Sequence, residues 1–287
     1  MTPRTRLPRA TDRIRLAGTG LDVSPLCLGV SGSPKTVHAA FEAGINFFFV
    51  TADMHWPYYA ALRKGLQSLL ASRRGIRDEI VVAAVCYPTQ PDFNSMPFHE
   101  LVESVPGLDR IDVAVMGGVY ASDFMARYPV YAGHRRTAFE GTRAIGATFH
   151  EREIVPAAAN HRLVDIAFSR YNPAHAGARE SVFPHLKRRG RAPLFNFKST
   201  YGFVGPKRRA ELGLPKRLWQ PQVTDYYRFA LSAPEMDGLL CSPWTPHQVQ
   251  ELVDALEHGP LTSDEQAFLM NLARLDAGEL ELEPDAS

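Results

Sequence analysis

The sequence predicts a single (β/α)₈ barrel with an N-terminal β-hairpin and an extra C-terminal helix. The chain has 287 residues, of which 45% are hydrophobic, and this is enough for one large core. Short continuous apolar runs recur along it, as in strands that are buried on both faces of a parallel sheet. Helical patterns separate these runs, and alternating strands and helices favour a closed barrel.

The hairpin comes first. Residues 14–24 hold two short extended runs around Gly18 and Gly20, which is turn chemistry. The basic residues 1–13 and the acidic residues 277–287 lack apolar periodicity, so we predict a flexible N-terminal tail and an acidic C-terminal tail. The barrel domain is predicted to span residues 14–276.

Eight strands and the helices between them can be assigned from the hydrophobic pattern. The predicted strands are residues 26–30, 46–50, 80–86, 112–117, 144–148, 165–169, 193–197 and 238–241. The helical patterns between them cover residues 36–43, 58–71, 99–105, 123–140, 157–163, 178–187 and 247–258.

The helices at the end of the chain have the clearest boundaries. Thr245, followed by a proline, is a typical N-cap, and Gly259 ends that helix. A last helix opens with Thr262 or Ser263 as N-cap and has Glu265 near the capping-box position. We expect this helix to pack outside the barrel.

Charge and cysteine content narrow the partners and the compartment. The 32 basic and 31 acidic side chains nearly balance, so nothing favours nucleic acid or an anionic membrane, and small molecules are the expected partners. No apolar run is long enough for a signal or a membrane span, which predicts a cytoplasmic protein. Cys27, Cys86 and Cys241 form no CxxC pair and are predicted to be buried thiols. No HxxxH or HExxH pattern occurs among the ten histidines, so no metal site is predicted.

The order of several segments resembles that of the aldo-keto reductases. IRLAGTGLDVSPLCLG, a helix and then FEAGINFFFVTAD are similar to the family's opening, where a hairpin, VSxLxLG and AGINxFDTA occur in that order. RDEIVVAA, LDRIDVAVM and GTRAIGATF look like its third to fifth strands, and SPWTPHQVQELVDAL like its eighth strand and the helix after it. RYNPAHAGARESVFPHL and FKSTYG also resemble a bacterial branch of the superfamily. The similarity runs from Ile14 to Leu261 and implies reduction of a carbonyl by hydride transfer from NADPH.

Four positions depart from the residues that perform the family's chemistry. Members use a tyrosine as proton donor, a lysine and an aspartate that tune its pKa, and a histidine that orients the substrate. The aligned positions hold His55 for the tyrosine, Val50 for the aspartate, Val85 or Cys86 for the lysine and Gly117 for the histidine. A phenol needs a nearby cation to donate a proton at neutral pH. The family's usual donor is therefore not expected to operate here.

Other residues on the predicted C-terminal rim could replace it, since barrel active sites are built there. An imidazole titrates near pH 6.5, so His55 could donate a proton without a lysine. Tyr58, Tyr59 and His150 are further acid–base candidates. The alternative is that these rings close an apolar mouth and that His55 has a purely structural role.

Arg170 follows the sixth predicted strand, with Asn172 and His175 close behind. This fork of donors suits a carboxylate or an oxyanion. The alternative is a structural ion pair between Arg170 and Glu151. The catalytic candidates are therefore His55, Tyr58, Tyr59, His150 and Arg170.

The resemblance implies NADP as the cofactor. Phe197 stands near the position of the aromatic ring that stacks on nicotinamide, and Thr148 aligns with residues that hold the nicotinamide amide. Trp244 falls where an arginine usually binds the 2′-phosphate. The implied cofactor-binding set is Thr148, Asn172, Phe197, Lys198, Ser242, Trp244 and Gln248. Five basic residues after the seventh strand could bind the phosphate instead, or form a solvated loop: Lys207, Arg208, Arg209, Lys216 and Arg217.

Three functions remain open from the sequence. The first is a divergent NADP(H)-dependent oxidoreductase with His55 as proton donor. The second is a lyase, isomerase or cyclase that uses His55, His150 and the two tyrosines without a cofactor, on a substrate bound by Arg170. The third is a non-catalytic barrel that binds a ligand, which the apolar Val85 and Gly117 would favour.

Overall fold

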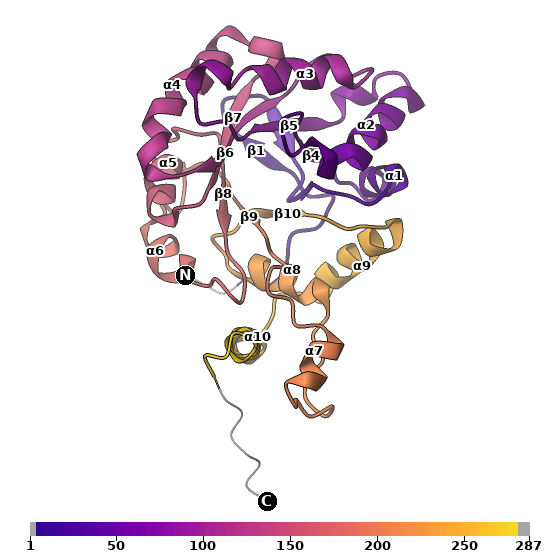
Figure 1. The fold of residues 1–287 in the computed structure, drawn as a ribbon, viewed down its shortest axis with the longest axis vertical. Helices are drawn as coiled ribbons and strands as arrows, with labels where there is room; N and C mark the ends of the chain where they lie inside the picture. Colours follow the sequence, from indigo (N-terminus) through magenta and orange to yellow (C-terminus); the bar gives the residue numbers. More distant parts are fainter. Residues whose placement is uncertain (1–3, 281–287) are drawn as a thin grey trace, which may run out of the picture.

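The computed structural model describes residues 4–280, and eight parallel strands within this range close into a barrel (Figure 1). The strands are β3 (Leu26–Leu28), β4 (Phe47–Val50), β5 (Val81–Cys86), β6 (Val113–Val119), β7 (Ala144–Phe149), β8 (Ile166–Arg170), β9 (Leu194–Phe197) and β10 (Gly238–Cys241). They follow one another around the barrel in chain order, and β10 closes it against β3. The predicted fold class is confirmed.

Helices surround these strands (Figure 1). They are α1 (Pro34–Glu42), α2 (Ala60–Ser72), α3 (Met96–Ser104), α4 (Ala121–Thr137), α5 (Val155–Asn160), α6 (Ala178–Ser181), α7 (Pro206–Glu211), α8 (Val223–Ser232), α9 (Pro246–Glu257) and α10 (Ser263–Asp276). Of the helices within residues 4–280, none combines the length and the apolar character that crossing a membrane requires.

Two parts of the helix assignment are corrected. The sequence analysis places no helix between the seventh and eighth strands, where α7 and α8 lie. All eight residues from Asp225 to Ser232 are buried, and the polar ones among them bond inside the fold, as Arg228 does to Asp225 at 2.8 Å, so they mark no solvent-facing side of α8. The predicted helix 178–187 is divided into α6 and the 3₁₀ turn Phe183–His185, because Pro184 cannot donate the next helical hydrogen bond.

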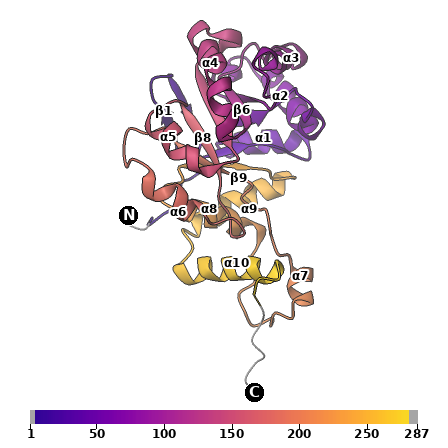
Figure 2. The same cartoon turned by 60° about the vertical axis from the view of Figure 1, so that its left-hand side comes forward.

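The caps of the last two helices are as predicted. Thr245 accepts a hydrogen bond from the Gln248 N–H at 3.2 Å. Thr262 accepts one from the Glu265 N–H at 3.2 Å, and the Glu265 carboxylate accepts one from the Thr262 N–H at 2.7 Å. These reciprocal bonds make a capping box. Figure 2 shows α10 on the outside of the barrel below α8 and α9 and beside α7.

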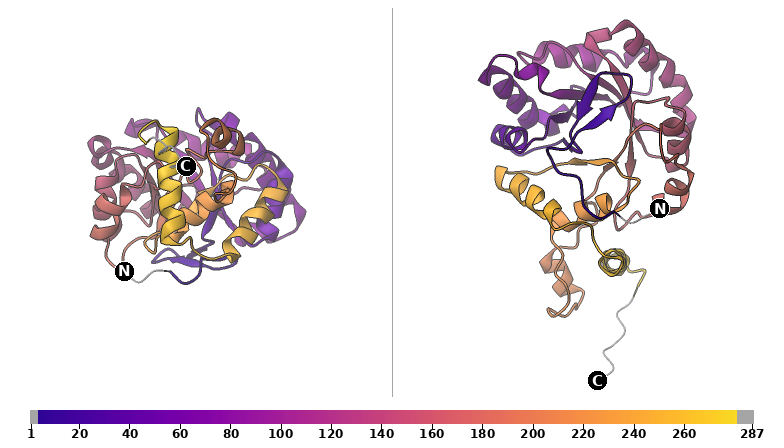
Figure 3. Two further views of the ribbon diagram at one scale, coloured as in Figure 1. Left: turned by 90° about the horizontal axis from the view of Figure 1, so that it is seen from below. Right: turned by 180° about the vertical axis from the view of Figure 1, so that it is seen from behind.

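The hairpin lies across the N-terminal end of the barrel (Figure 3, right). Its strands β1 (Ile14–Leu16) and β2 (Leu21–Val23) pair antiparallel, with Leu16, Leu21 and Val23 buried. This confirms the predicted hairpin. The hairpin covers the end of the barrel opposite to that on which the strands finish.

Two apolar side chains in the predicted N-terminal tail are buried. Leu7 and Ala10 are each 3% exposed and belong to the core. Arg4 donates to the carbonyl oxygens of Pro234 and Met236 at 3.3 and 2.9 Å. Leu7 and Ala10 thus hold this segment to the barrel, whereas Arg6, Arg9 and Arg13 are exposed. Of the predicted C-terminal tail, residues 281–287 lie outside the described residues.

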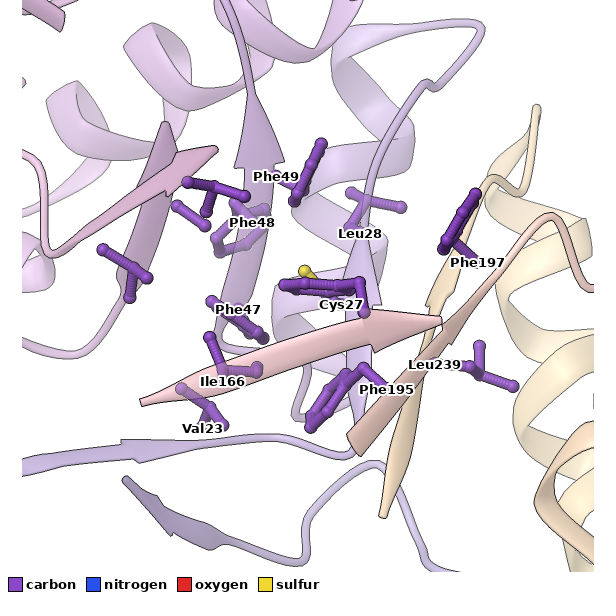
Figure 4. Close-up of a cluster of buried hydrophobic side chains, with 14 of the residues drawn as sticks. Val23, Cys27, Leu28, Phe47, Phe48, Phe49, Ile166, Phe195, Phe197 and Leu239 are labelled. Carbon is purple, nitrogen blue, oxygen red and sulfur yellow. The ribbon is translucent and has the colours of Figure 1, made fainter. Parts of the chain in front are cut away.

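Aromatic side chains fill the barrel. The rings of Phe47 and Phe195 lie 5.8 Å apart, those of Phe49 and Phe168 5.4 Å, and those of Phe168 and Phe195 5.7 Å. Figure 4 shows several of these rings beside Cys27, which like Cys86 and Cys241 is a buried free thiol. The barrel is therefore a packed core rather than a pore.

Gly238, at the start of β10, permits close packing inside the barrel. A Cβ there would press against the Pro25 carbonyl and lie 2.5 Å from Cε1 of Phe195. We expect Gly238→Ala to lower the free energy of unfolding by about 1–3 kcal/mol, because neither a backbone carbonyl nor a core ring can move cheaply. Urea denaturation measures this change. The control is Gly133→Ala in α4, where the nearest atom is 3.9 Å away. Equal stability of the Gly238→Ala variant and the parent protein would contradict this account.

Candidate functional site

Polar and aromatic side chains gather where the barrel strands end. Asp53 and His55 follow β4, Tyr87 follows β5, Tyr120 follows β6 and His150 follows β7. Parallel strands in a barrel all finish on one face, so these residues share one rim. We call this rim the barrel mouth.

Asp53 holds His55 in place. Its Oδ1 accepts a hydrogen bond from the His55 backbone N–H at 2.9 Å and lies 3.1 Å from the imidazole Nδ1. Its Oδ2 accepts one from the Tyr87 backbone N–H at 2.9 Å. The side chain of Asp53 is 3% exposed and that of His55 is 40% exposed. The pair therefore joins a buried, fixed carboxylate to an imidazole that reaches solvent.

Tyr87 fills the space beside this pair. Its ring centroid lies 4.3 Å from that of His55. A Cβ at Gly117 would be 2.6 Å from Cδ1 of Tyr87, so the phenol takes the place that a side chain at Gly117 would need. Val50 and Val85 are fully buried. Val50, Val85 and Gly117 carry no side chain that could hydrogen-bond to the imidazole.

The two predicted tyrosines differ in their surroundings. Tyr58 is 71% exposed, whereas Tyr59 is 7% exposed. Burial, with a smaller effect of the Asp53 charge, raises the pKa of Tyr59 well above its usual value. Burial and Asp53 also raise the pKa of Tyr87 to about 12. Both buried phenols are therefore neutral at neutral pH.

His150 stands on the other side of the mouth. Its Nδ1 lies 3.3 Å from the Tyr120 hydroxyl, and its ring centroid lies 6.1 Å from that of Phe197. A Cβ at Gly118 would lie 3.6 Å from Cδ1 of Tyr87 and 3.8 Å from Nε2 of His150. The two halves of the mouth therefore meet across Gly118.

Arg170 does not form the structural ion pair with Glu151 that we considered. The Glu151 carboxylate accepts a hydrogen bond from the Ala121 N–H at 2.7 Å. Within residues 4–280, no carboxylate lies within 4.0 Å of the Arg170 guanidinium. Its charge acts on His150, whose pKa is lowered by burial and then by Lys198 and Arg170.

Two of the residues predicted to bind a cofactor are engaged within the chain. Asn172 is fully buried, donates to the Lys198 carbonyl at 2.8 Å and has its Oδ1 3.2 Å from Nδ1 of His175. Both ends of its amide are thus occupied. Thr148 accepts a hydrogen bond from the Gly118 N–H at 2.7 Å and keeps its own hydroxyl proton for another partner.

Trp244 and Gln248 join two loops. The Trp244 N–H donates to Oε1 of Gln248 at 2.6 Å, and the Trp244 carbonyl accepts from the Gly32 N–H and the Thr36 hydroxyl, both at 3.1 Å. The Trp244 indole is 59% exposed and lies against Gly32. Ser242 is exposed nearby.

Arg208 and Arg209, which follow the seventh strand, are also engaged. Arg208 donates to Asp276 at 2.6 Å. Arg209 is 3% exposed and donates to the carbonyl oxygens of Val204 and Pro221 at 2.7 and 2.9 Å. These two side chains hold the loop and α10 in place, so they do not fit a phosphate-binding role.

The sequence analysis missed Asp53 and Tyr87 as site residues. The spacing of Asp53 and His55 carried a signal, because an acidic side chain two residues before a histidine can accept from its backbone and its ring. Tyr87 is the first residue after the third barrel strand, a position on the active rim. Only the fold shows that both meet at His55.

A cavity of about 500 Å³ opens beside the Asp53–His55 pair. It is lined by Ala52, Trp56, Arg63, Glu100, Glu103 and Ser104. Within residues 4–280, histidine, cysteine and carboxylate side chains form no group of three that could hold a metal ion.

Comparisons with solved structures agree on the fold. Aldo-keto reductase AKR11C1 from Bacillus halodurans, in its holo form, is 14% identical to this chain, with a TM-score of 0.69 over 96% of this chain and 100% of that one. A putative aldo-keto reductase from Pseudomonas aeruginosa is 16% identical, with a TM-score of 0.63 over 88% and 98% of the two chains. A thermostable aldo-keto reductase solved with the inhibitor epalrestat is 13% identical, with a TM-score of 0.66 over 91% and 99%. No family model matches the sequence, and no curated protein does. The chain has the fold of these reductases.

Proposed function

From this shared fold, we propose that the chain is a divergent NADP(H)-dependent oxidoreductase that acts on a small carbonyl or alcohol in the cytoplasm, with His55 as the proton donor. The Asp53–His55 pair carries the proposal. Asp53 accepts from Nδ1 of His55, which leaves Nε2 to exchange a proton with the substrate oxygen. A buried carboxylate that orients an imidazole makes a proton-transfer group without any lysine.

Residues on the opposite side of the mouth fit the nicotinamide end of a dinucleotide. Phe197 offers a ring that is 8% exposed at the end of β9, and Thr148 has a hydroxyl proton free for an amide oxygen. Lys198, next to Phe197, is exposed and has no carboxylate within 4.0 Å among residues 4–280. When bound there, the dinucleotide would supply the hydride.

Calorimetry with NADPH tests cofactor binding, and His55→Gln tests the donor. We expect measurable binding that weakens in Phe197→Ala, because the stacking ring is lost. His55→Gln should keep NADPH binding and lower turnover of small aldehydes by about 10²- to 10⁴-fold, which is the usual effect of losing a positioned acid. His161→Gln, at an exposed histidine, is the control. No heat of binding at millimolar NADPH would remove the redox proposal.

A second candidate is favoured by the residues at the proposed adenosine end. Trp244 and Gln248 bond to each other, and Arg208 and Arg209 are engaged within the chain. A lyase, isomerase or cyclase that uses the Asp53–His55 pair would need none of them for a cofactor. Turnover that depends on His55 without NADPH binding selects this candidate. If no reaction depends on His55, the remaining candidate is a barrel that binds a ligand without catalysis.

A further inference from the structure

Three permanent cations come together at the ends of β7, β8 and β9. Arg170 is the last residue of β8 and lies opposite Phe197 in the sheet register, and Lys198 follows Phe197 directly. Arg152 comes from the loop after β7, and its guanidinium lies against Gly177, where a Cβ would be 2.7 Å from both Nη atoms. We call Arg152, Arg170 and Lys198 the cationic cluster.

Two histidines lie within the field of this cluster. Burial lowers the pKa of His175, and the charges of Arg170, Arg152 and Lys198 lower it further. Burial followed by Lys198 and Arg170 does the same for the pKa of His150. No acidic group is among the causes for either ring. The residues that hydrogen-bond or pack their rings against these histidines are uncharged: Asn172 and Tyr201 at His175, and Tyr120 and Phe197 at His150.

The cluster differs from four other partly or fully buried arginines, which are paired with aspartates. Arg77 with Asp112, Arg127 with Asp123, Arg191 with Asp237 and Arg228 with Asp225 all have an N–O distance of 3.2 Å or less. In the described part of the chain, neither arginine of the cluster nor Lys198 has a carboxylate within 4.0 Å. Like charges at the edge of a low-dielectric barrel repel one another and attract anions. The cationic cluster thus lacks the carboxylate counter-charge that the fold supplies to those four arginines.

We propose that the cationic cluster binds the anionic group, a carboxylate or a phosphate, of a small ligand in the barrel mouth. A guanidinium group matches the oxygen pair of such an anion, and Lys198 adds a point charge. His150 and Tyr87 lie on the two sides of Gly118, and the Tyr87 ring lies against His55. His150 therefore stands between the cationic cluster and the Asp53–His55 pair. That the anion belongs to the substrate rests on the proposed function, whereas the site itself does not.

Calorimetry without NADPH tests the site with malonate, inorganic phosphate and pyrophosphate as probes. We expect malonate or phosphate to bind, and Arg170→Gln and Arg152→Gln each to weaken binding by about tenfold or more, the range of a lost charge-assisted hydrogen bond. Arg188→Gln, which removes the same charge from an exposed residue of the loop between α6 and β9, should bind like the parent protein. Affinity should fall as salt rises, because both partners are partly solvated.

Histidine titration by NMR separates the two arginines without any turnover. Arg170→Gln should raise the pKa of both His150 and His175, because removing a cation favours the protonated ring. Arg152→Gln should raise only that of His175, since Arg152 acts on His175 alone. Saturation with malonate or phosphate should raise both pKa values.

Several outcomes would overturn the inference. It fails if no probe binds more tightly than chloride, or if Arg170→Gln binds like the parent protein while circular dichroism shows it folded. It also fails if pyrophosphate alone binds and competes with NADPH, which would give the cluster to the dinucleotide. Anion binding without NADPH binding would instead keep the site and remove the redox proposal, so the two can fail separately.

Discussion

Asp53→Asn is expected to lower turnover by about 10²- to 10⁴-fold, nearly as much as loss of His55 itself. Asp53 accepts three hydrogen bonds, two from His55 and one from Tyr87. An asparagine has one accepting oxygen, so its NH₂ must face either the Tyr87 N–H or the His55 side. If the NH₂ group faces the His55 ring, it donates a hydrogen bond to Nδ1. The neutral imidazole must then carry its own proton on Nε2.

The tautomer of the neutral His55 ring distinguishes loss of positioning by Asp53 from a general loss of structure. Nitrogen-15 NMR of His55 should show Nδ1 protonated in the neutral ring of the parent protein and Nε2 protonated in Asp53→Asn. The control is Asp22→Asn, in the hairpin at the other end of the barrel, where Asp22 pairs with Arg15 at 2.8 Å. An unchanged tautomer together with unchanged turnover would show that Asp53 does not act through His55.

Arg127→Met is expected to lower the free energy of unfolding by about 3–5 kcal/mol. Arg127 is fully buried in α4 and donates to the carbonyl oxygens of Gly117 at 2.9 Å and Cys86 at 3.1 Å. It also pairs with Asp123 at 3.2 Å. Methionine fills much of the volume but leaves two buried carbonyl groups without this donor and Asp123 without its cation.

Chemical and thermal denaturation measure this loss, which corresponds to a fall in Tm of roughly 6–15 °C for a chain of this size. Arg136→Met, at an exposed position of the same helix, should change stability by less than about 0.5 kcal/mol. A decrease of less than about 1 kcal/mol in the free energy of unfolding of Arg127→Met would mean that the ends of β5 and β6 stay in place without the guanidinium. The same change should loosen Tyr87, which directly follows Cys86.

The architecture could be predicted because its signals are local. Buried strands such as 46–50 are continuous apolar runs, and caps such as Thr245 and Thr262 act within one helical turn. The prediction failed at α8, where polar side chains such as Asp225 and Arg228 are buried and bond to each other instead of facing solvent. It also failed for Leu7 and Ala10, whose buried positions depend on elements far along the chain.

The candidate site residues and their roles stay predictions. The aligned positions directed attention to His55, and the rim rule to His150 and Arg170, all of which lie at the barrel mouth. Sequence patterns did not reveal that both ends of the Asn172 amide are hydrogen-bonded within the chain. They also did not reveal that the Arg209 guanidinium donates to a carbonyl oxygen of its own loop. Hydrogen bonds between segments far apart in the chain determine which polar groups remain free. The spacing of residues along the sequence does not reveal these bonds.

The sequence by itself determined the barrel, the order of its strands and the face on which chemistry-bearing residues lie, because periodicity and strand direction are properties of short segments. Only the tertiary structure decided that Asp53 orients His55, that Tyr87 takes the space above Gly117, and that Arg152, Arg170 and Lys198 meet without a counter-charge. The physical reason is that electrostatic and hydrogen-bond partners are chosen by distance in space, which closure of the barrel sets for residues far apart in the chain.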